Sequence, residues 1–375
     1  MAVGGIAGFH RGVAGRVFSL VGPMGTPARV VHDGISSGVY QAIGMGFRAV
    51  GVGGDAMLAR RRFEEGRPVS SDPRGARALA ALAGLRGDVL EEDGSDLVEP
   101  MSIREGGEIV DLPADPGPRM VVFTHGLMGT EHWWCLGGRE CYGERLRADI
   151  GATPVHLRYN TGRHISENGL ALADLLEDLI DRWPVELEEI ALVGHSMGGL
   201  VARSACCVGA QRGDRWIGLV RQTITLGTPH MGAPLEQLAH RGSAYLHKLP
   251  ETRPVANFLR RRSSGIRDLR RGSLVDEDWR DQDRDVLRAR AVQEVPLLPD
   301  VTHCFVSATV THSPSHPLGR LVGDWLVLQP SASGIGRTRR IPFDEEFGFH
   351  LGGAGHIALL NHPRVYEQLL GWLRT

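Results

Sequence analysis

The 375-residue sequence has little lysine, little net charge and no long apolar run near its start. Lys248 is its only lysine, so chemistry through a lysine Schiff base is not expected. The 42 basic and 44 acidic residues nearly cancel, which leaves no basic footprint for nucleic-acid binding. The uncharged stretch Gly34–Phe47 is too short and too rich in glycine to span a bilayer. Because Arg11 and Arg16 interrupt the apolar N-terminal segment, it does not match a signal peptide either.

Cysteine is also scarce. The five cysteines are Cys135, Cys141, Cys206, Cys207 and Cys304. An odd number would leave one of them outside any disulfide framework, and no spacing among them is typical of a zinc site. We therefore expect reduced, mostly buried thiols, no metal and a cytoplasmic protein.

The rest of the composition is that of a folded globular protein, with 42% apolar and 23% charged residues. A chain of this length can bury a full core, which argues against disorder. Apolar residues recur every three or four positions from Val31 to Val50, which predicts a helix, and we expect a second helix around Ala76–Leu85. We assign residues 1–95 to an N-terminal helical extension. A membrane-surface role for the first helix is the weaker alternative, because it lacks a basic polar face.

From Leu97 onward, short apolar segments alternate with helical patterns. The expected strands are Leu97–Arg104, Met120–Thr124, Pro154–Tyr159, Ile190–Val193, Gln222–Leu226 and Thr302–Thr309, and the expected helices are Ser166–Trp183, Met197–Ala210 and Pro363–Leu373. Short apolar segments bounded by turns fit strands that are buried on both faces of a parallel sheet. Residues 96–375 are thus expected to form one α/β domain with a mainly parallel sheet.

Residues 231–295 interrupt this alternation. They contain arginine clusters followed by an acidic run from Asp276 to Asp285, and we expect a helical insertion. One interpretation is a solvated surface whose charges cancel. The other is a lid over a pocket, since long insertions in compact domains are often lids.

The segment Gly194-His195-Ser196-Met197-Gly198 matches G-x-S-x-G, in which a strand turns sharply into a helix. The apolar residues Ile190–Val193 precede it, and small and apolar residues follow. Such a turn lifts the serine hydroxyl above the sheet edge, at a helix N-terminus that favours negative charge. A second match, centred on Ser36, lies inside the first predicted helix and has no candidate oxyanion loop before it. We therefore expect Ser196 to be the nucleophile.

The loop His125-Gly126-Leu127-Met128-Gly129 directly follows a predicted strand. A loop in this place donates a backbone N–H to an oxyanion hole. The N–H groups of Leu127 and Met197 are the expected pair, and they would stabilise the tetrahedral oxyanion of acyl transfer. His125 is an alternative base, although its position before Gly126 suits a structural role at the loop entrance better.

These segments together resemble a bacterial lipase or esterase of the α/β-hydrolase family, near its lipase and GPI-inositol-deacylase-like branch. The resemblance is carried by residues 124–129, 159–162, 192–201, 225–230 and 323–327 and by the region around His356. It covers about residues 97–375 and implies an α/β-hydrolase fold with helices on both faces of the sheet. The first ninety or so residues are not explained by it.

The family runs its triad in the order serine, acid, histidine. Candidates for the acid are Asp300, Asp324, Asp344 and Glu345, and candidates for the base are His350, His356 and His362. Asp324 matches the family's Gly-Asp-x-Leu-Val segment, and His356 follows a glycine-rich run just ahead of the last helix, where the family places its base. His362 lies beside Pro363, where a helix cap is ordinary.

The roles of the three residues follow from their chemistry. Ser196 is a weak nucleophile and needs a base within hydrogen-bond reach. His356 would take its proton and return it to the leaving group, while Asp324 fixes the imidazole tautomer and stabilises the imidazolium.

Three residues are candidates for substrate binding. Met128 and Trp133 could line an apolar acyl site, with core packing as the alternative. His230 follows a predicted strand at the sheet edge where sites form in open α/β sheets, with a structural role in its turn as the alternative.

The sequence thus predicts a carboxylic ester hydrolase that uses an acyl-serine intermediate, no cofactor and a lipid or other hydrophobic ester as substrate. Acyltransferase, amidase or thioesterase activity would use the same residues, and a non-catalytic binding protein on this fold is a further alternative. No nucleic-acid partner is expected, a transient contact with a membrane surface is left open, and the sequence does not define the oligomeric state.

Overall fold

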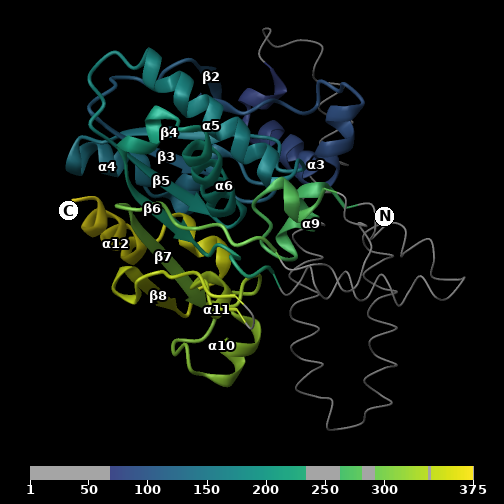
Figure 1. The fold of residues 1–375 in the computed structure, drawn as a ribbon, viewed down its shortest axis with the longest axis vertical. Coiled ribbons are helices and arrows are strands. Elements are labelled where there is room, and N and C mark those ends of the chain that lie inside the picture. Colours follow the sequence, from purple (N-terminus) through teal and green to yellow (C-terminus); the bar gives the residue numbers. More distant parts are fainter. Residues whose placement is uncertain (1–67, 234–261, 281–291, 337–338, 375) are drawn as a thin grey trace, which may run out of the picture. The chain divides into compact units, whose positions relative to one another are not determined.

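An eight-stranded sheet runs through residues 102–352 of the computed structural model (Figure 1). Its strands are β1 (Ser102–Glu105), β2 (Glu108–Val110), β3 (Arg119–Thr124), β4 (Thr153–Arg158), β5 (Glu189–His195), β6 (Val220–Leu226), β7 (Thr302–Thr309) and β8 (Gly348–Gly352). They lie in the order β2-β1-β4-β3-β5-β6-β7-β8. β1 is antiparallel to both of its neighbours, whereas β4, β3, β5, β6, β7 and β8 run parallel. The predicted fold class, a mainly parallel α/β sheet, is confirmed.

The structure describes residues 68–233, 262–280, 292–336 and 339–374. The chain divides into two compact units, Met1–Ala78 and Leu79–Thr375, and the sheet belongs to the second. The predicted helix at Val31–Val50, with Ser36, lies outside the described residues, as does most of the 231–295 insertion. The helix expected at Ala76–Leu85 is part of α3 (Pro73–Glu92).

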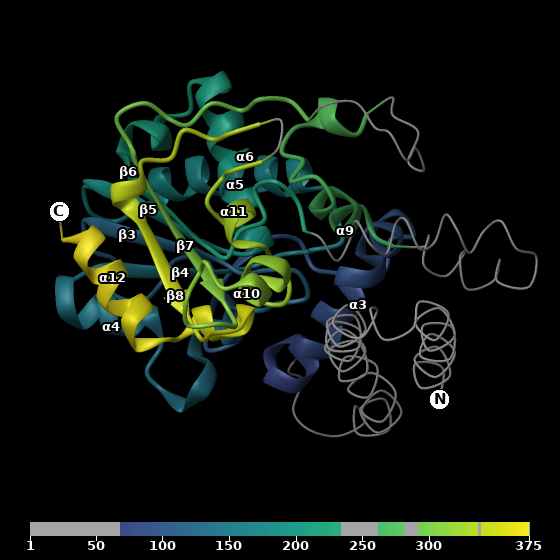
Figure 2. The ribbon, with the colours of Figure 1, turned by 90° about the horizontal axis from the view of Figure 1, so that it is seen from below.

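Alternation along the strands divides the core between the two faces of the sheet. On β3, Met120 and Val122 point to one hydrophobic cluster, and Val121 and Phe123 point to another. Helices α5 (Ile165–Arg182) and α6 (Met197–Arg212) cover the first face. Helices α4 (Tyr142–Ile150) and α12 (Pro363–Leu373) cover the second (Figure 2). The predicted placement of helices on both faces is therefore confirmed.

The other described helices are short. They are α9 (Ser264–Leu269), α10 (Pro317–Val322), α11 (Gln329–Ala332) and the 3₁₀ helices η2 (Val69–Ser71), η3 (Glu131–Gly138), η4 (Arg215–Leu219), η6 (Asp276–Asp278), η7 (Glu345–Phe347) and η8 (His356–Leu360). Each helix among the described residues is too short or too polar to pass through a membrane.

The first predicted strand is shorter than expected. β1 begins at Ser102 rather than Leu97, because Pro100 has no N–H to donate to a ladder. Gly106 and Gly107 then form the hairpin turn to β2 with φ of 59° and 93°, the left-handed values that a tight two-residue turn requires.

The described part of the insertion, residues 262–280, is tied to the domain through buried carboxylates. Asp268 accepts hydrogen bonds from the Ile165 N–H (2.9 Å) and His164 Nδ1 (3.0 Å). Asp278 accepts from the N–H groups of Leu274 (2.9 Å) and Gln293 (2.7 Å). Both carboxylates are buried, so a solvated surface with cancelling charges does not describe them.

The expectation of five reduced thiols is wrong, because Cys135 and Cys141 form a disulfide. The glycines between them, Gly137 and Gly138, have φ of 82° and 70°, which turns the chain back so that the two Cα atoms lie 4.3 Å apart. Within the described residues, the other three cysteines are free.

Candidate active site

Ser196 lies at the predicted sharp turn between β5 and α6, with φ 54° and ψ −121°. This backbone conformation is strained for a residue with a side chain. The glycines around it are required by packing: a Cβ on Gly198 would lie 2.0 Å from the Thr124 carbonyl oxygen, and one on Gly194 would lie 2.5 Å from Gly199 Cα. The motif therefore forms the turn that lifts a serine above the carboxyl edge of the sheet.

His356 and Asp324 form a buried pair, with His356 Nδ1 2.7 Å from Asp324 Oδ2. The other carboxylate oxygen, Oδ1, accepts hydrogen bonds from the N–H groups of Leu326 (3.0 Å) and Val327 (2.8 Å). The His356 N–H also donates to the Asp324 carbonyl oxygen, at 3.0 Å. A carboxylate at Nδ1 holds the proton there and leaves Nε2 as the basic nitrogen.

The backbone around Ser196 touches the His356 loop at two points. The Ser196 N–H donates to Leu226 at the end of β6, and a Cβ on the next residue, Gly227, would lie 3.1 Å from His356 Cε1. His195 Nε2 lies 3.2 Å from the His356 carbonyl oxygen. Ser196 directly follows β5, and His356 opens η8 after β8. Asp324 follows α10, where the Gly323 carbonyl oxygen accepts from the Val310 N–H just after β7. The three residues thus follow parallel strands of the sheet, and their catalytic roles stay a prediction.

The predicted oxyanion loop lies against the serine. Gly126 to Gly129 form a turn closed by a 2.9 Å hydrogen bond from the Gly129 N–H, and Met128 has φ 59°. A Cβ on Gly126 would lie 3.0 Å from Ser196 Cβ. The Met128 N–H donates to Thr161 Oγ1 (3.2 Å), and the Met197 N–H is at the start of α6, where the first amides have no partner within the helix. The turn therefore lies beside Ser196, and the assignment of the Leu127 and Met197 amides to an oxyanion hole stays a prediction.

Two residues that hold this loop had no role in the sequence prediction. Tyr159 donates its hydroxyl to the His125 carbonyl oxygen at 2.7 Å, and Thr161 accepts from Met128. Both belong to the segment Tyr159-Asn160-Thr161-Gly162 that carries part of the family resemblance. The motif marked the segment, but its contact with a loop more than 30 residues earlier was not visible in the sequence.

His125 lies at the entrance of this loop and is completely buried. Burial lowers the pKa of His125 to about 4, so its imidazole is neutral near pH 7. Its ring stacks on Tyr159, and Nδ1 lies 2.9 Å from the Gly126 carbonyl oxygen. These contacts favour the structural role over that of a second base.

The alternative acids and bases have other surroundings. Asp300 is exposed, and Asp344 caps η7 by accepting from the Glu346 N–H. His350 lies 3.0 Å from the hydroxyls of Ser307 and Thr309, and His362 caps α12 as expected. The structure therefore favours Asp324 and His356.

The three predicted substrate-binding residues have different environments. The Met128 side chain packs over Gly84 of α3, and Trp133 is half-buried against the cluster beneath α4 and α12. His230 is completely buried, 3.4 Å from Arg203 and 3.3 Å from Thr225, and burial holds its pKa well below the ordinary value. This position favours the structural alternative for His230.

Among residues 68–233, 262–280, 292–336 and 339–374, no cluster of His, Cys, Asp and Glu side chains is arranged to hold a metal ion.

Residues 117–293 match the family model of the PGAP1-like alpha/beta domain. No curated protein is similar enough to count as a relative. Among solved structures, the mature lipase BlEst2 of Bacillus licheniformis is 19% identical, with a TM-score of 0.46 over 72% of this chain and 99% of that one. An esterase of Pyrobaculum calidifontis is 14% identical, with a TM-score of 0.42 over 84% of this chain and 95% of that one.

The family match and the sheet agree with the resemblance drawn from the motifs. The centre of the chain is similar to a PGAP1-like alpha/beta domain, and its fold is that of an α/β hydrolase.

Proposed function

We propose that the protein is a serine hydrolase of carboxylic esters. The observation that carries this proposal is the buried His356–Asp324 pair beside the strained turn of Ser196. A neutral imidazole whose Nδ1 is held by a carboxylate is a base for a serine hydroxyl. The amides of Leu127 and Met197 supply the two donors that a tetrahedral oxyanion needs.

The reaction has two halves. His356 takes the proton of Ser196 as the hydroxyl attacks the ester carbonyl, and then returns it to the leaving alcohol as the acyl-serine forms. Water then attacks the acyl-serine by the same route, with His356 again as the base. The imidazolium formed in each half is stabilised by the Asp324 carboxylate.

A lipid or other hydrophobic ester is the proposed substrate. Trp325 and Ile357, each next in sequence to a triad residue, are 45% and 44% exposed. Leu318 and Leu321 of α10 are exposed in the same part of the chain. Exposed apolar side chains gathered near a site mark a surface for an apolar ligand or a membrane. We therefore also propose a transient contact with a lipid surface.

Flotation with phospholipid vesicles tests this contact. The wild type should float with vesicles, and the double variant Leu318→Ser, Leu321→Ser should not. Leu170→Ser, which replaces an exposed leucine on α5, is the matched control and should still float. Equal flotation of all three proteins would contradict the assignment to α10.

Other predicted properties remain proposals. Residues 1–95 are proposed as a helical extension, residues 96–375 as the catalytic domain and residues 231–295 as its lid-like insertion. The cytoplasmic location is also still a prediction, and the Cys135–Cys141 disulfide speaks against it, because such bonds persist mostly in oxidising compartments.

The nearest rival activities, acyl transfer and cleavage of amides or thioesters, use the same residues. A series of p-nitrophenyl esters from acetyl to palmitoyl tests the proposal. Hydrolysis should be abolished in Ser196→Ala and unchanged in Ser36→Ala, and the preferred chain length would separate an esterase from a lipase. Full activity in Ser196→Ala, or no turnover of any ester by the wild type, would contradict it.

A further inference from the structure

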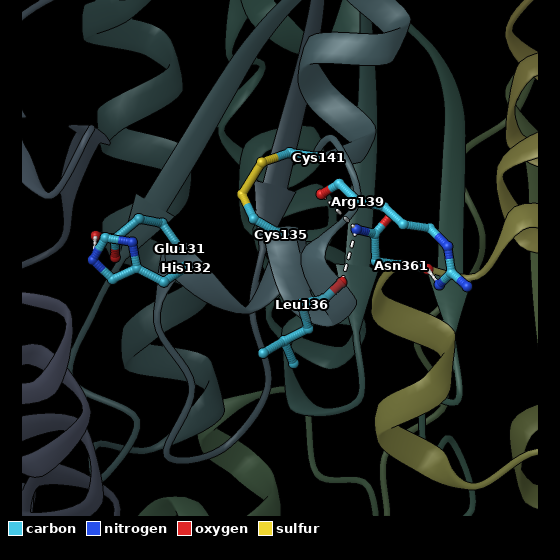
Figure 3. Close-up of a disulfide and its surroundings, with 7 residues drawn as sticks. All are labelled: Glu131, His132, Cys135, Leu136, Arg139, Cys141 and Asn361. Atoms are coloured by element: carbon cyan, nitrogen blue, oxygen red, sulfur yellow. Dashed lines mark hydrogen bonds and ion pairs between the residues drawn. A yellow bond between two sulfur atoms is a disulfide. The ribbon is translucent and has the colours of Figure 1, made fainter.

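The disulfide-closed loop, residues 135–141, lies against the segment that follows the catalytic histidine (Figure 3). The side-chain amide of Asn361, five residues after His356, donates to the carbonyl oxygens of Leu136 (2.9 Å) and Arg139 (3.3 Å). Arg139 Nη1 in turn donates to the Asn361 carbonyl oxygen at 3.3 Å. Three hydrogen bonds thus join two segments more than 200 residues apart.

Tyr142, directly after the second cysteine, extends this contact. Its completely buried hydroxyl lies 3.0 Å from the Leu359 carbonyl oxygen and accepts a 2.6 Å hydrogen bond from the His362 N–H. Burial raises the pKa of Tyr142, so the phenol keeps the proton that it donates. The loop and Tyr142 therefore hold the chain on both sides of Asn361.

The segment that carries His356 is held on both sides. His356 opens η8, a 3₁₀ helix of only five residues, and follows Gly352–Gly355. Before His356, the N–H groups of Gly353 and Ala354 donate to the Thr311 and Thr309 carbonyl oxygens, both at 3.0 Å. Asp324 holds His356 from one side, and the contacts at 359–362 hold η8 at its far end.

The loop that supplies these contacts is itself weakly anchored. Residues 137–140 are exposed, and two of them are glycines in the left-handed region. A cross-link across such a loop removes conformations in which its carbonyls would turn away. The disulfide thus keeps the Leu136 and Arg139 carbonyls where Asn361 meets them.

We infer that three groups position His356: the Tyr142 hydroxyl, the Asn361 side-chain amide and the Cys135–Cys141 disulfide. This inference rests on the proposed function. They do not touch the substrate; they hold η8 so that the imidazole meets the Ser196 hydroxyl. Because displacement of a catalytic group by about 1 Å can lower a rate by about a hundred-fold, loosening them lowers kcat while substrate binding is kept.

Steady-state hydrolysis of a short p-nitrophenyl ester tests this inference on the full chain. Tyr142→Phe removes the hydroxyl, Asn361→Asp removes the amide donors, and the double variant Cys135→Ser, Cys141→Ser removes the cross-link. Each is expected to lower kcat by about ten-fold or more, with KM changed by less than about two-fold. The rate at which a fluorophosphonate labels Ser196 should fall in parallel, because that rate reports how well His356 activates the serine.

Tyr366→Phe is the matched control. Tyr366 is buried beside Tyr142, but its hydroxyl donates to Asp149 rather than to the His356 segment. Its removal should lower Tm about as much as Tyr142→Phe while kcat stays at the wild-type value. Assays well below each Tm separate misplacement from unfolding, and the two single variants decide the question if the cysteine variant does not fold.

The outcomes are distinct. Wild-type kcat in folded Tyr142→Phe and Asn361→Asp, or an equal loss of kcat in Tyr366→Phe, would overturn the positioning role and leave the proposed function standing. A wild type that neither turns over the ester nor reacts with the fluorophosphonate would overturn the proposed function, and the inference with it.

Discussion

At the scale of single residues, the orientation of the Asp324 carboxylate determines which ring nitrogen of His356 carries the proton. Asp324 uses Oδ1 for two backbone amides and Oδ2 for His356. In Asp324→Asn, the side-chain oxygen can keep the two backbone bonds, so its NH₂ group faces His356 Nδ1. That nitrogen must then accept, which places the proton on Nε2, the wrong tautomer for a base.

We therefore expect Asp324→Asn to lower kcat by about 10⁴-fold while the protein remains folded. Steady-state kinetics beside a circular dichroism melt measure both quantities. Asp344→Asn, at an exposed cap of η7, is the control and should keep full activity. A loss of less than ten-fold in Asp324→Asn would count against the assignment of the acid.

The backbone conformation of Ser196 also lowers the stability of the fold. Its φ of 54° is accessible to glycine without strain, but it strains alanine as much as serine. The free energy of unfolding of Ser196→Gly should therefore exceed that of Ser196→Ala by about 1 kcal/mol, the reverse of the order at ordinary helical positions. Urea unfolding of the two inactive variants measures this difference. A more stable alanine variant would show that the turn is not strained.

The sequence marked Ser196, Asp324 and His356 as triad candidates but not the groups that contact them. The three candidates could be named because their motifs are local and the predicted family places them in a fixed order along the chain. Thr161 and Tyr142 could not, since each acts through a backbone group distant in sequence. Hydrogen bonds of that kind leave no pattern in a single sequence.

At the scale of elements, α9 packs against Thr161, which holds the predicted oxyanion loop. A Cβ on Gly265 would lie 2.2 Å from the Thr161 carbonyl oxygen and 2.7 Å from Met197 Cε. The first contact is with backbone and cannot be relieved by a rotamer change. Gly265→Ala therefore has to lift α9 away from Thr161.

Gly265→Ala should lower the free energy of unfolding by about 2 kcal/mol and reduce kcat, because Thr161 holds the Met128 amide. Gly371→Ala is the control: a Cβ there meets nothing within 4 Å, and alanine in α12 should stabilise by about 0.8 kcal/mol. Denaturant titrations of both variants measure these changes. An unchanged free energy of unfolding in Gly265→Ala would contradict the packing of α9 against Thr161.

Elements with long or regular apolar patterns were predicted best. α12 has the predicted bounds, Pro363–Leu373, and the parallel strands differ from prediction by one or two residues at most ends. β8 was not predicted, because Gly348 and Gly352 flank too few apolar residues to mark a strand. The Cys135–Cys141 disulfide was missed because a spacing of six residues does not show that the chain turns back between them.

At the scale of the whole molecule, buried neutral histidines make stability depend on pH. His125, His195 and His230 are each buried, and burial lowers the pKa of each below its ordinary value, to about 4 for His125. The unfolded chain takes up these protons near pH 6.5, whereas the folded chain does not. These three histidines therefore do not lower the free energy of unfolding above about pH 6.5. The free energy of unfolding falls as the pH drops from 6.5 towards 4.

His125 should add up to about 1.4 kcal/mol per pH unit to the slope of unfolding free energy between pH 6 and 5, and His195 and His230 should steepen it in the same direction. Urea titrations across that range measure the slope. His125→Asn, whose amide can replace Nδ1 at the Gly126 carbonyl oxygen, should reduce it by up to about 1.4 kcal/mol per pH unit. An unchanged slope would mean that His125 is protonated in the folded protein.

The central claim, that Ser196 is a nucleophile activated by His356 and Asp324, is tested most directly by trapping. The full-length protein is treated with an alkyl p-nitrophenyl phosphonate and digested, and the masses of its peptides are measured by mass spectrometry. We expect one phosphonyl adduct, on the peptide that contains Ser196. It should form much more slowly in Asp324→Asn and be absent in Ser196→Ala. No adduct on the wild type, or an adduct on the peptide that contains Ser36, would contradict the claim.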